Sequence, residues 1–140
     1  MRIMFLFSAA LLAAGTLAAQ DAAVVARDAW VRLPLPSKTE TALYLTLENH
    51  SAQPRAVAGG TSDAAEKIEL HEMKMVKMVM SMTPVAEVKI PAKGKRSFNP
   101  DGYHIMLFGL KSKLSVGDTV NVTLKLDDGS TVPVTATVRK

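Results

Sequence analysis

The sequence predicts an all-β fold, a single compact β-sandwich, and three observations predict it. Apolar and polar residues alternate with a period of two through most of the chain, as in strands with one buried face. Turn-forming residues interrupt this pattern about every 8 to 12 residues, which is typical of a sandwich or barrel. A length of 140 residues corresponds to one domain. We therefore expect roughly seven or eight short strands.

The first two expected strands are bounded by proline-containing turns. Ala29–Leu35 is a short apolar run that Pro36 closes. Leu43–Leu47 alternates leucine with polar or aromatic residues, which predicts a strand with one face in the core. The polar stretch Asn49–Pro54 then predicts a turn.

The middle of the chain gives one strand and one weak helical candidate. Gly59–Ser62 is expected to break the chain, because paired glycines interrupt regular structure. Ser62–Lys67 is the only segment with helical character, and it is too short to carry much expectation. Lys67–His71 is expected to be extended.

The second half of the chain shows the clearest strand pattern. Val85–Ile90 precedes a proline, and Tyr103–Leu110 follows the turn signal Asn99–Gly102. Val120–Leu126 and Val132–Val138 alternate strictly and are joined by an Asp-Asp-Gly turn. That turn chemistry predicts a β-hairpin.

The first nineteen residues resemble a secretory signal peptide. Arg2 forms a short positive region, Ile3–Leu12 is strongly apolar, and Ala13–Ala19 is rich in small residues. We expect cleavage after Ala18 or Ala19, and an exported, periplasmic protein.

An uncleaved membrane anchor is the alternative, because about 17 apolar residues can just span a bilayer. Gly15 and Thr16 argue against it. We therefore expect residues 20–140 to form the single mature domain.

Composition narrows the class of function. The sequence has no cysteine, which excludes a disulfide and a cysteine-based lipid anchor and fits an oxidising compartment. The net charge is +4, but the lysines are scattered and aromatic residues are few. Without a basic stripe and stacking platforms we expect no nucleic-acid binding. We expect a monomer that meets a membrane only through a partner.

Methionine and histidine are concentrated in one region. Six of the eight methionines and two of the three histidines fall between His71 and Met106. Thioethers and imidazoles without thiolates form a ligand set suited to Cu(I). Five methionines in Met73–Met82 are interleaved with lysine and serine, so this segment is too polar for a core strand and too apolar for an idle loop.

Strand geometry indicates how such ligands converge. Side chains two residues apart on a strand share a face, so His104 lies beside Met106, and His71 beside Met73. A turn near Val76–Met78 would bring Met82 back alongside His71. Ligands from these strands could then complete a site of two histidines and two methionines.

Non-metal interpretations remain open at this point. Methionines often fill gaps in a core or form an adaptable surface for a protein partner. We interpret His50 as a turn residue, and Trp30 and Tyr44 as core residues. A partner surface does not explain two histidines at matching offsets.

The spacing resembles that of the periplasmic copper chaperone family called PCuAC, whose signature is His-x10-Met-x21-His-x-Met. All three gaps match with His71, Met82, His104 and Met106. Ile68–Met73, Gly102–Leu110, Ala29–Arg32 and Tyr44–Asn49 also resemble the family, so the similarity covers most of the mature chain.

This resemblance implies a cupredoxin-like Greek-key β-sandwich that binds Cu(I) through those four residues. It also implies delivery to a copper-accepting protein, either a cytochrome oxidase subunit or another assembly factor. Family members often have glycine where this chain has Met78, and some carry a His- and Met-rich tail where this chain ends at Val138–Lys140.

The remaining methionines and the rival functions complete the expectations. Met73, Met75 and Met80 are secondary ligand candidates, which with Met78 form an apolar collar, offer transient ligands or only shield the site. We expect a carrier and not an enzyme, and blue-copper electron transfer is excluded because it needs a cysteine. A copper storage or tolerance carrier and a metal-free secreted interaction domain are the alternatives.

Overall fold

The computed structural model describes residues 23–140, and every regular element in that range is a β-strand. The ten strands are β1 (Val24–Arg32), β2 (Glu40–Asn49), β3 (Arg55–Ser62), β4 (Ala65–Val76), β5 (Val79–Val85), β6 (Val88–Ile90), β7 (Lys95–Phe98), β8 (Tyr103–Leu110), β9 (Thr119–Leu126) and β10 (Thr131–Arg139). The described chain therefore offers no helix able to cross a bilayer. The all-β prediction is confirmed. The expected signal peptide, residues 1–19, lies outside the described residues.

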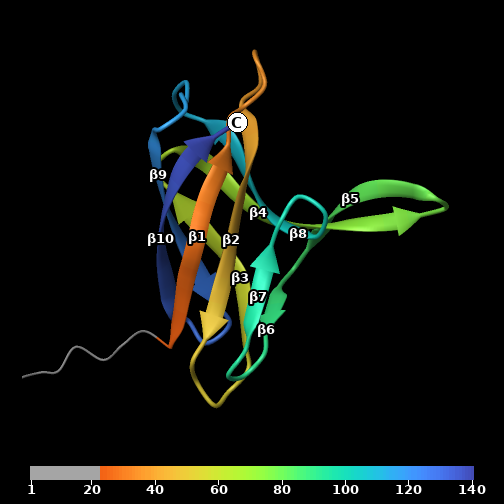
Figure 1. Cartoon of the computed structure of the whole chain (residues 1–140), viewed down its shortest axis with the longest axis vertical. Helices are drawn as coiled ribbons and strands as arrows, with labels where there is room; N and C mark the ends of the chain where they lie inside the picture. The colour runs from red at the N-terminus through yellow and green to blue at the C-terminus, as the bar shows by residue number, and fades with distance from the viewer. Residues whose placement is uncertain (1–22) are drawn as a thin grey trace, which may run out of the picture.

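The strands form one sheet that bends back over itself into two layers (Figure 1). Its order is β5-β4-β8-β2-β1-β10-β9-β3-β6, with β7 paired to β2. β1 and β10 run parallel, whereas the other pairings are antiparallel. A short contact between Ser62 of β3 and Ala65 of β4 joins the layers again. The result is a nearly closed sandwich.

The main core lies between the two layers and follows the period-two pattern. Every second side chain of β9 and β10 is buried, as their sequences predict. On the facing layer, Leu43, Ile105 and Leu107 are fully buried. The core thus uses one face of β2 and β8, which leaves their other face free for a site.

Two predicted features of the middle of the chain are wrong. Ser62–Lys67 is not helical, because β3 runs to Ser62 and β4 begins at Ala65 after a tight turn. Gly59 and Gly60 do not break the chain but lie within β3, next to a register shift. A Cβ on Gly60 would stand 2.7 Å from the carbonyl oxygen of Thr123, so glycine there permits close pairing with β9.

The edges of other elements also differ from prediction. β1 spans Val24–Arg32 and not Ala29–Leu35, because a bulge between Arg27 and Trp30 interrupts its alternation. Asp28 in that bulge has φ of 53°. The described range holds ten strands, more than expected, and β7 is too short for a clear period. The predicted strand Val85–Ile90 is not continuous, because β5 ends at Val85 and β6 begins at Val88.

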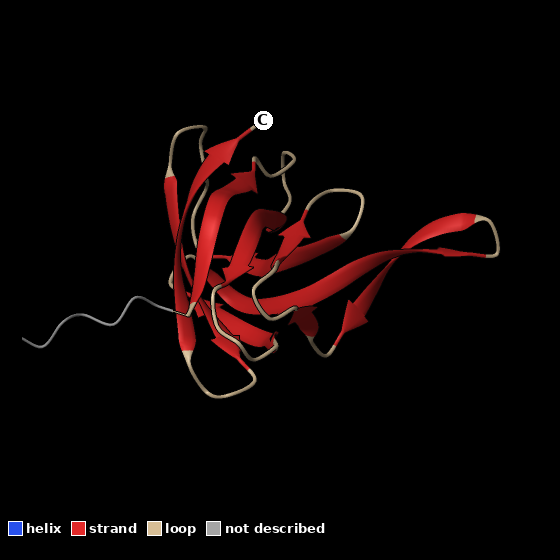
Figure 2. Cartoon of the chain, turned by 60° about the horizontal axis from the view of Figure 1, so that its bottom comes forward, coloured by secondary structure: helices blue, strands red, loops and turns tan. Residues whose placement is uncertain are grey.

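β4 and β5 form a hairpin that projects well beyond the sandwich (Figure 2). Its turn lies at Lys77 and Met78, with φ of 50° and 65°, close to the expected place. Two residues with positive φ fit a two-residue hairpin loop, which glycine and asparagine favour. The pairing of β4 with β8 ends at Glu72, so the outer part of the hairpin has only two strands.

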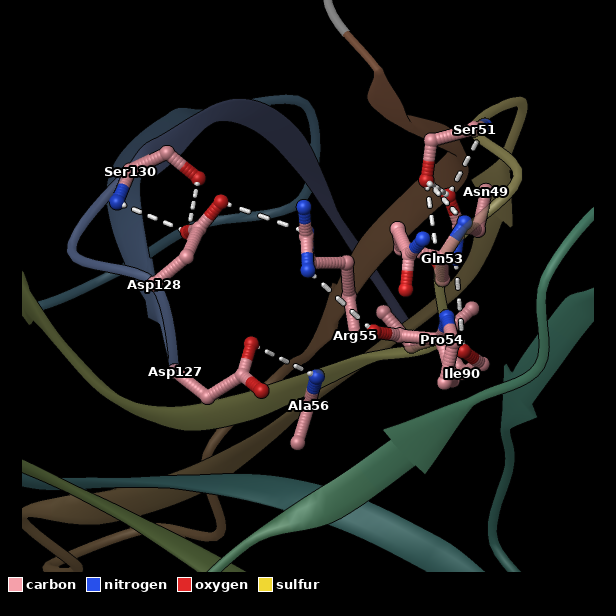
Figure 3. A network of polar contacts seen from close by, with 10 residues as sticks. All are labelled: Asn49, Ser51, Gln53, Pro54, Arg55, Ala56, Ile90, Asp127, Asp128 and Ser130. Atoms are coloured by element: carbon pink, nitrogen blue, oxygen red, sulfur yellow. Dashed lines mark hydrogen bonds and ion pairs between the residues drawn. The ribbon is translucent and has the colours of Figure 1, made fainter.

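A polar network ties two turns together at one end of the sandwich (Figure 3). The buried side chain of Asn49 donates to the carbonyl of Gln53 at 2.8 Å and accepts from Ser51. Arg55 pairs with Asp128 at 3.2 Å. Hydrogen bonds from Ser130, and then the positive charge of Arg55, hold the pKa of Asp128 below its ordinary value. These contacts satisfy the polar groups of the two turns, so this cluster has a structural role.

Candidate metal centre

The two histidines predicted as ligands lie directly opposite each other on neighbouring strands. His71 of β4 pairs with His104 of β8, and their ring centroids are 5.8 Å apart. Met106 follows His104 by two residues and therefore leaves the same face of β8. Ile105 between them belongs to the main core. The sheet thus places two imidazoles and a thioether together on the face opposite the core.

These three side chains are buried although they lie on the outer face. Their exposed fractions are 8% for His71, 3% for His104 and 7% for Met106. A second apolar cluster occupies this face and consists of Ala42, Tyr44, Met106, Trp30 and Phe108. The rings of Tyr44 and Trp30 contact each other at a tilt, with centroids 4.7 Å apart, and aromatic rings flank both imidazoles. Tyr44 and Trp30, predicted to be core residues, do pack in an apolar cluster, but it is this second one and not the main core between the layers.

Each imidazole is fixed through one ring nitrogen and leaves the other without a partner. His71 Nε2 donates to a carboxylate oxygen of Glu69 at 2.9 Å. His104 Nδ1 donates to the carbonyl oxygen of Gly102 at 3.1 Å. Since both acceptors lack hydrogen, the neutral rings carry their proton on those nitrogens. His71 Nδ1 and His104 Nε2 are therefore bare lone pairs, and both are buried without a hydrogen-bond partner.

An unpaired buried nitrogen costs free energy, so two of them on one face call for an explanation. Histidines that bind a metal characteristically donate their other N–H to a carboxylate or carbonyl, which orients the ring. Glu69 and Gly102 are partners of that kind. The arrangement has the chemistry of a metal site built from imidazole and thioether.

The local electrostatics favour a neutral His104 and an ionised Glu69. Burial lowers the pKa of His104, and the nearby His71 and Arg32 add to this, while the hydrogen bond to Gly102 opposes it. His104 is therefore neutral at pH 7. Hydrogen bonds from Lys67 and then His71 hold the pKa of Glu69 below its ordinary value. Glu69 thus stays ionised and remains a hydrogen-bond acceptor.

The fourth predicted ligand, Met82, lies next to this group at the base of the hairpin. It was expected alongside His71, but it pairs with Met73, and His71 faces Pro84 instead. The reason is the two-residue turn, which fixes the register of β5 against β4. Met82 shares the face of His71 and is its diagonal neighbour, within reach of a long side chain. It is 51% exposed.

The secondary candidates continue outward along the same face. Met75 pairs with Met80, which is the next pair on this face after Met73 and Met82. Both are exposed, and Met78 at the turn is almost fully exposed. The structure therefore places a ladder of thioethers beside the histidine pair.

Sequence reasoning assigned no role to Glu69. The sequence did indicate that Glu69 lies beside His71, because residues two apart on a strand share a face. The carbonyl of Gly102 could not be foreseen, since it depends on the turn before β8. Phe108 was likewise missed, although it follows Met106 at the same two-residue offset.

Glu69→Gln is expected to weaken metal binding at this site by about tenfold, as is usual when an orienting partner of a ligand is changed. Glutamine keeps the volume but not the charge that makes the imidazole more basic. Glu72→Gln is the matched control, because Glu72 pairs with Lys74 at 3.7 Å and not with a histidine. Competition with a chelator measures both affinities, and equal values for the two variants would contradict the role of Glu69.

Comparison with known proteins assigns the chain to a family. Residues 24–138 match the protein family described as "Putative lipoprotein LpqE-like". The chain belongs to this family. One curated relative is "Putative lipoprotein Lxx21020" of Leifsonia xyli subsp. xyli, 36% identical over 112 residues, which are 79% of this chain and 66% of that protein. The chain thus spans slightly less than two thirds of the length of that relative.

Solved structures support the resemblance to PCuAC domains. Apo DR1885 from Deinococcus radiodurans is 38% identical, with a TM-score of 0.64, and the match covers 100% of this chain and 94% of that one. Its Cu(I) form is 40% identical, with a TM-score of 0.61 and coverage of 91% and 83%. The copper-bound PCuAC domain from PmoF2 has a TM-score of 0.70 at 20% identity, covering 84% and 93%, which shows the fold. The predicted cupredoxin-like β-sandwich is confirmed.

Proposed function

We propose that this protein is an exported copper chaperone that binds Cu(I) as its cargo and delivers it to a copper-accepting protein. One observation carries the proposal: the buried lone pairs of His71 Nδ1 and His104 Nε2 have no hydrogen-bond partner, and a buried thioether lies beside them. The likeness to DR1885, whose structure includes a Cu(I) form, supports the same ion.

The proposed ligands are these two nitrogens and the sulfurs of Met106 and Met82. Opposed residues on antiparallel strands have Cβ atoms about 5 Å apart, close enough for two imidazoles to share one ion. Met106 approaches along β8 from the same face, and Met82 reaches diagonally from β5. Methionine has three rotatable side-chain bonds, so it adapts to such an offset.

The donor set favours Cu(I) over harder ions. All four ligands are neutral, and thioethers prefer soft ions, whereas Zn(II) sites draw on thiolates, imidazoles and carboxylates. No group of three or more histidine, aspartate or glutamate side chains able to hold a metal occurs in residues 23–140. A site with two thioethers therefore discriminates against Zn(II) and against the tetragonal preference of Cu(II).

The same ligand chemistry also favours release of the bound copper to an acceptor. Neutral thioethers and imidazoles hold Cu(I) less tightly than thiolates, so transfer to a cysteine-containing acceptor is downhill. Met82 is the exposed member of the set, and an acceptor ligand can replace it from the solvent side. We propose a cytochrome oxidase subunit or another assembly factor as the acceptor, reached in the periplasm after signal-peptide cleavage. The lipoprotein description of the relatives supports export.

Met82→Leu and Met106→Leu test the ligand set with little change in volume. Each is expected to weaken Cu(I) binding at the histidine site by about tenfold or more while leaving Zn(II) binding weak. Anaerobic titration against a Cu(I) chelator measures this. Met78→Leu is the matched control, because Met78 lies at the tip of the hairpin, at its turn.

Several results would contradict the assignment. If the Met82→Leu, Met106→Leu double variant binds Cu(I) as tightly as the wild type, neither thioether is a ligand. Loss in Met73→Leu but not in Met82→Leu would make Met73 the ligand. Tighter binding of Zn(II) than of Cu(I) would contradict the copper proposal.

Delivery is tested by asking whether the copper-loaded protein, but not the copper-free protein, captures oxidase subunits. If it does not, the result favours a storage carrier.

A further inference from the structure

Three methionines on the two strands of the hairpin are left unused by the proposed ligand set. Met73, Met75 and Met80 lie on the same face of the β4–β5 hairpin as His71. They are not part of either apolar cluster of the described residues. Among residues 23–140, six of the eight exposed large apolar side chains belong to this hairpin, namely Met75, Val76, Met78, Val79, Met80 and Met82. Core packing therefore does not explain these methionines.

The register brings their sulfur atoms within reach of one another. Met75 faces Met80 directly across the ladder, and Met73 is two residues from Met75 on the same strand. Directly opposed Cβ atoms lie about 5 Å apart, and side chains two residues apart on one strand about 7 Å. Metal–sulfur bonds are about 2.3 Å long, so three flexible methionine side chains can converge on one ion.

The charges of the hairpin leave this face free for a cation. Lys74 and Ser81 pair with each other and point to the opposite face, where Lys74 contacts Glu72 at 3.7 Å. Between His71 and the turn, the methionine face holds no charged side chain among the strand pairs. A monovalent cation on it meets neither the repulsion of a lysine nor a carboxylate that would favour a harder ion.

We infer that Met73, Met75 and Met80 form a second Cu(I) site, made of thioethers alone, on the outer part of the hairpin. The inference rests on the proposed function for the identity of the ion. Without imidazole the second site binds Cu(I) more weakly than the histidine site, by about tenfold or more. Because it adjoins Met82, it is the exposed station through which copper enters or leaves the buried pair.

The experiment counts Cu(I) bound per chain by anaerobic titration with a chelator competitor, and X-ray absorption identifies the ligands. The wild-type protein is expected to bind two equivalents, the weaker one with sulfur ligands only. The triple variant Met73→Leu, Met75→Leu, Met80→Leu keeps the apolar surface and is expected to bind one equivalent. Met78→Leu, the matched control, is expected to bind two.

A double variant, His71→Ala with His104→Ala, separates the two proposals. It is expected to retain one weak, all-sulfur equivalent. Two equivalents in the triple leucine variant would overturn the second site, as would a single equivalent in the wild type or none in the double histidine variant. Tight binding unchanged by the double histidine variant would instead overturn the proposed function. Circular dichroism on each variant confirms that the hairpin is intact.

Discussion

The double substitution His71→Ala, His104→Ala is expected to abolish tight Cu(I) binding, and each single substitution is expected to weaken it by about a hundredfold or more. Changing a residue that only orients a ligand costs about 10- to 100-fold, so removal of the ligand itself costs at least as much. The physical reason is that each imidazole presents a desolvated lone pair that no other described group satisfies. Chelator competition measures the affinity.

Thermal unfolding provides an independent readout of the same substitutions. A ligand that binds only the folded state raises its stability in proportion to the logarithm of its concentration over Kd. Copper is expected to raise the Tm of the wild type and to raise that of the double variant much less, since only the weaker thioether site remains there. His50→Ala is the control, because His50 is exposed and contacts Glu48 at 3.3 Å. A copper-induced shift as large in the double variant as in the wild type would contradict the assignment.

The sequence predicted the strands that have one face in the core and one in water. In β9 and β10 the burial alternates at every residue, so the period-two pattern identified both strands and their hairpin. β1 was displaced in the prediction because the bulge at Asp28 shifts its phase. Ser62–Lys67 was wrongly given helical character, because the local sequence does not show that a tight turn there joins two paired strands.

The candidate site, like the fold, was predictable only where local residue spacing determines it. Two-residue spacing alone predicted that His104 and Met106 share a face, and the structure agrees. The pairing of His71 with His104 depends on strand order, which local sequence does not contain. Met82 lies two residues further along the hairpin than predicted, because the register of β5 is set by where the turn at Lys77 and Met78 falls.

Acidification is expected to weaken Cu(I) binding steeply, by about a hundredfold or more between pH 7.5 and pH 5. A ligating imidazole must be neutral, so each protonated histidine costs about tenfold in affinity per pH unit below its pKa. Burial lowers the pKa of His104, so its share of the loss begins below the ordinary value of 6.5. A flat affinity profile down to pH 5 would exclude histidine ligation.

The same lowered pKa has a consequence for stability in the absence of copper. In the unfolded chain His104 takes up a proton near its ordinary pKa of 6.5, whereas the folded protein resists it. The unfolded state therefore binds more protons below that pH, and the free energy of unfolding must fall as the pH falls. Denaturant titrations at pH 7.5, 6.5 and 5.5 measure this slope. His104→Leu is expected to reduce the slope, because this buried imidazole then no longer couples its protonation to unfolding. Copper-loaded protein should lose stability more steeply than the copper-free form, because protonation then also expels the ion, and acid thus favours release of the cargo.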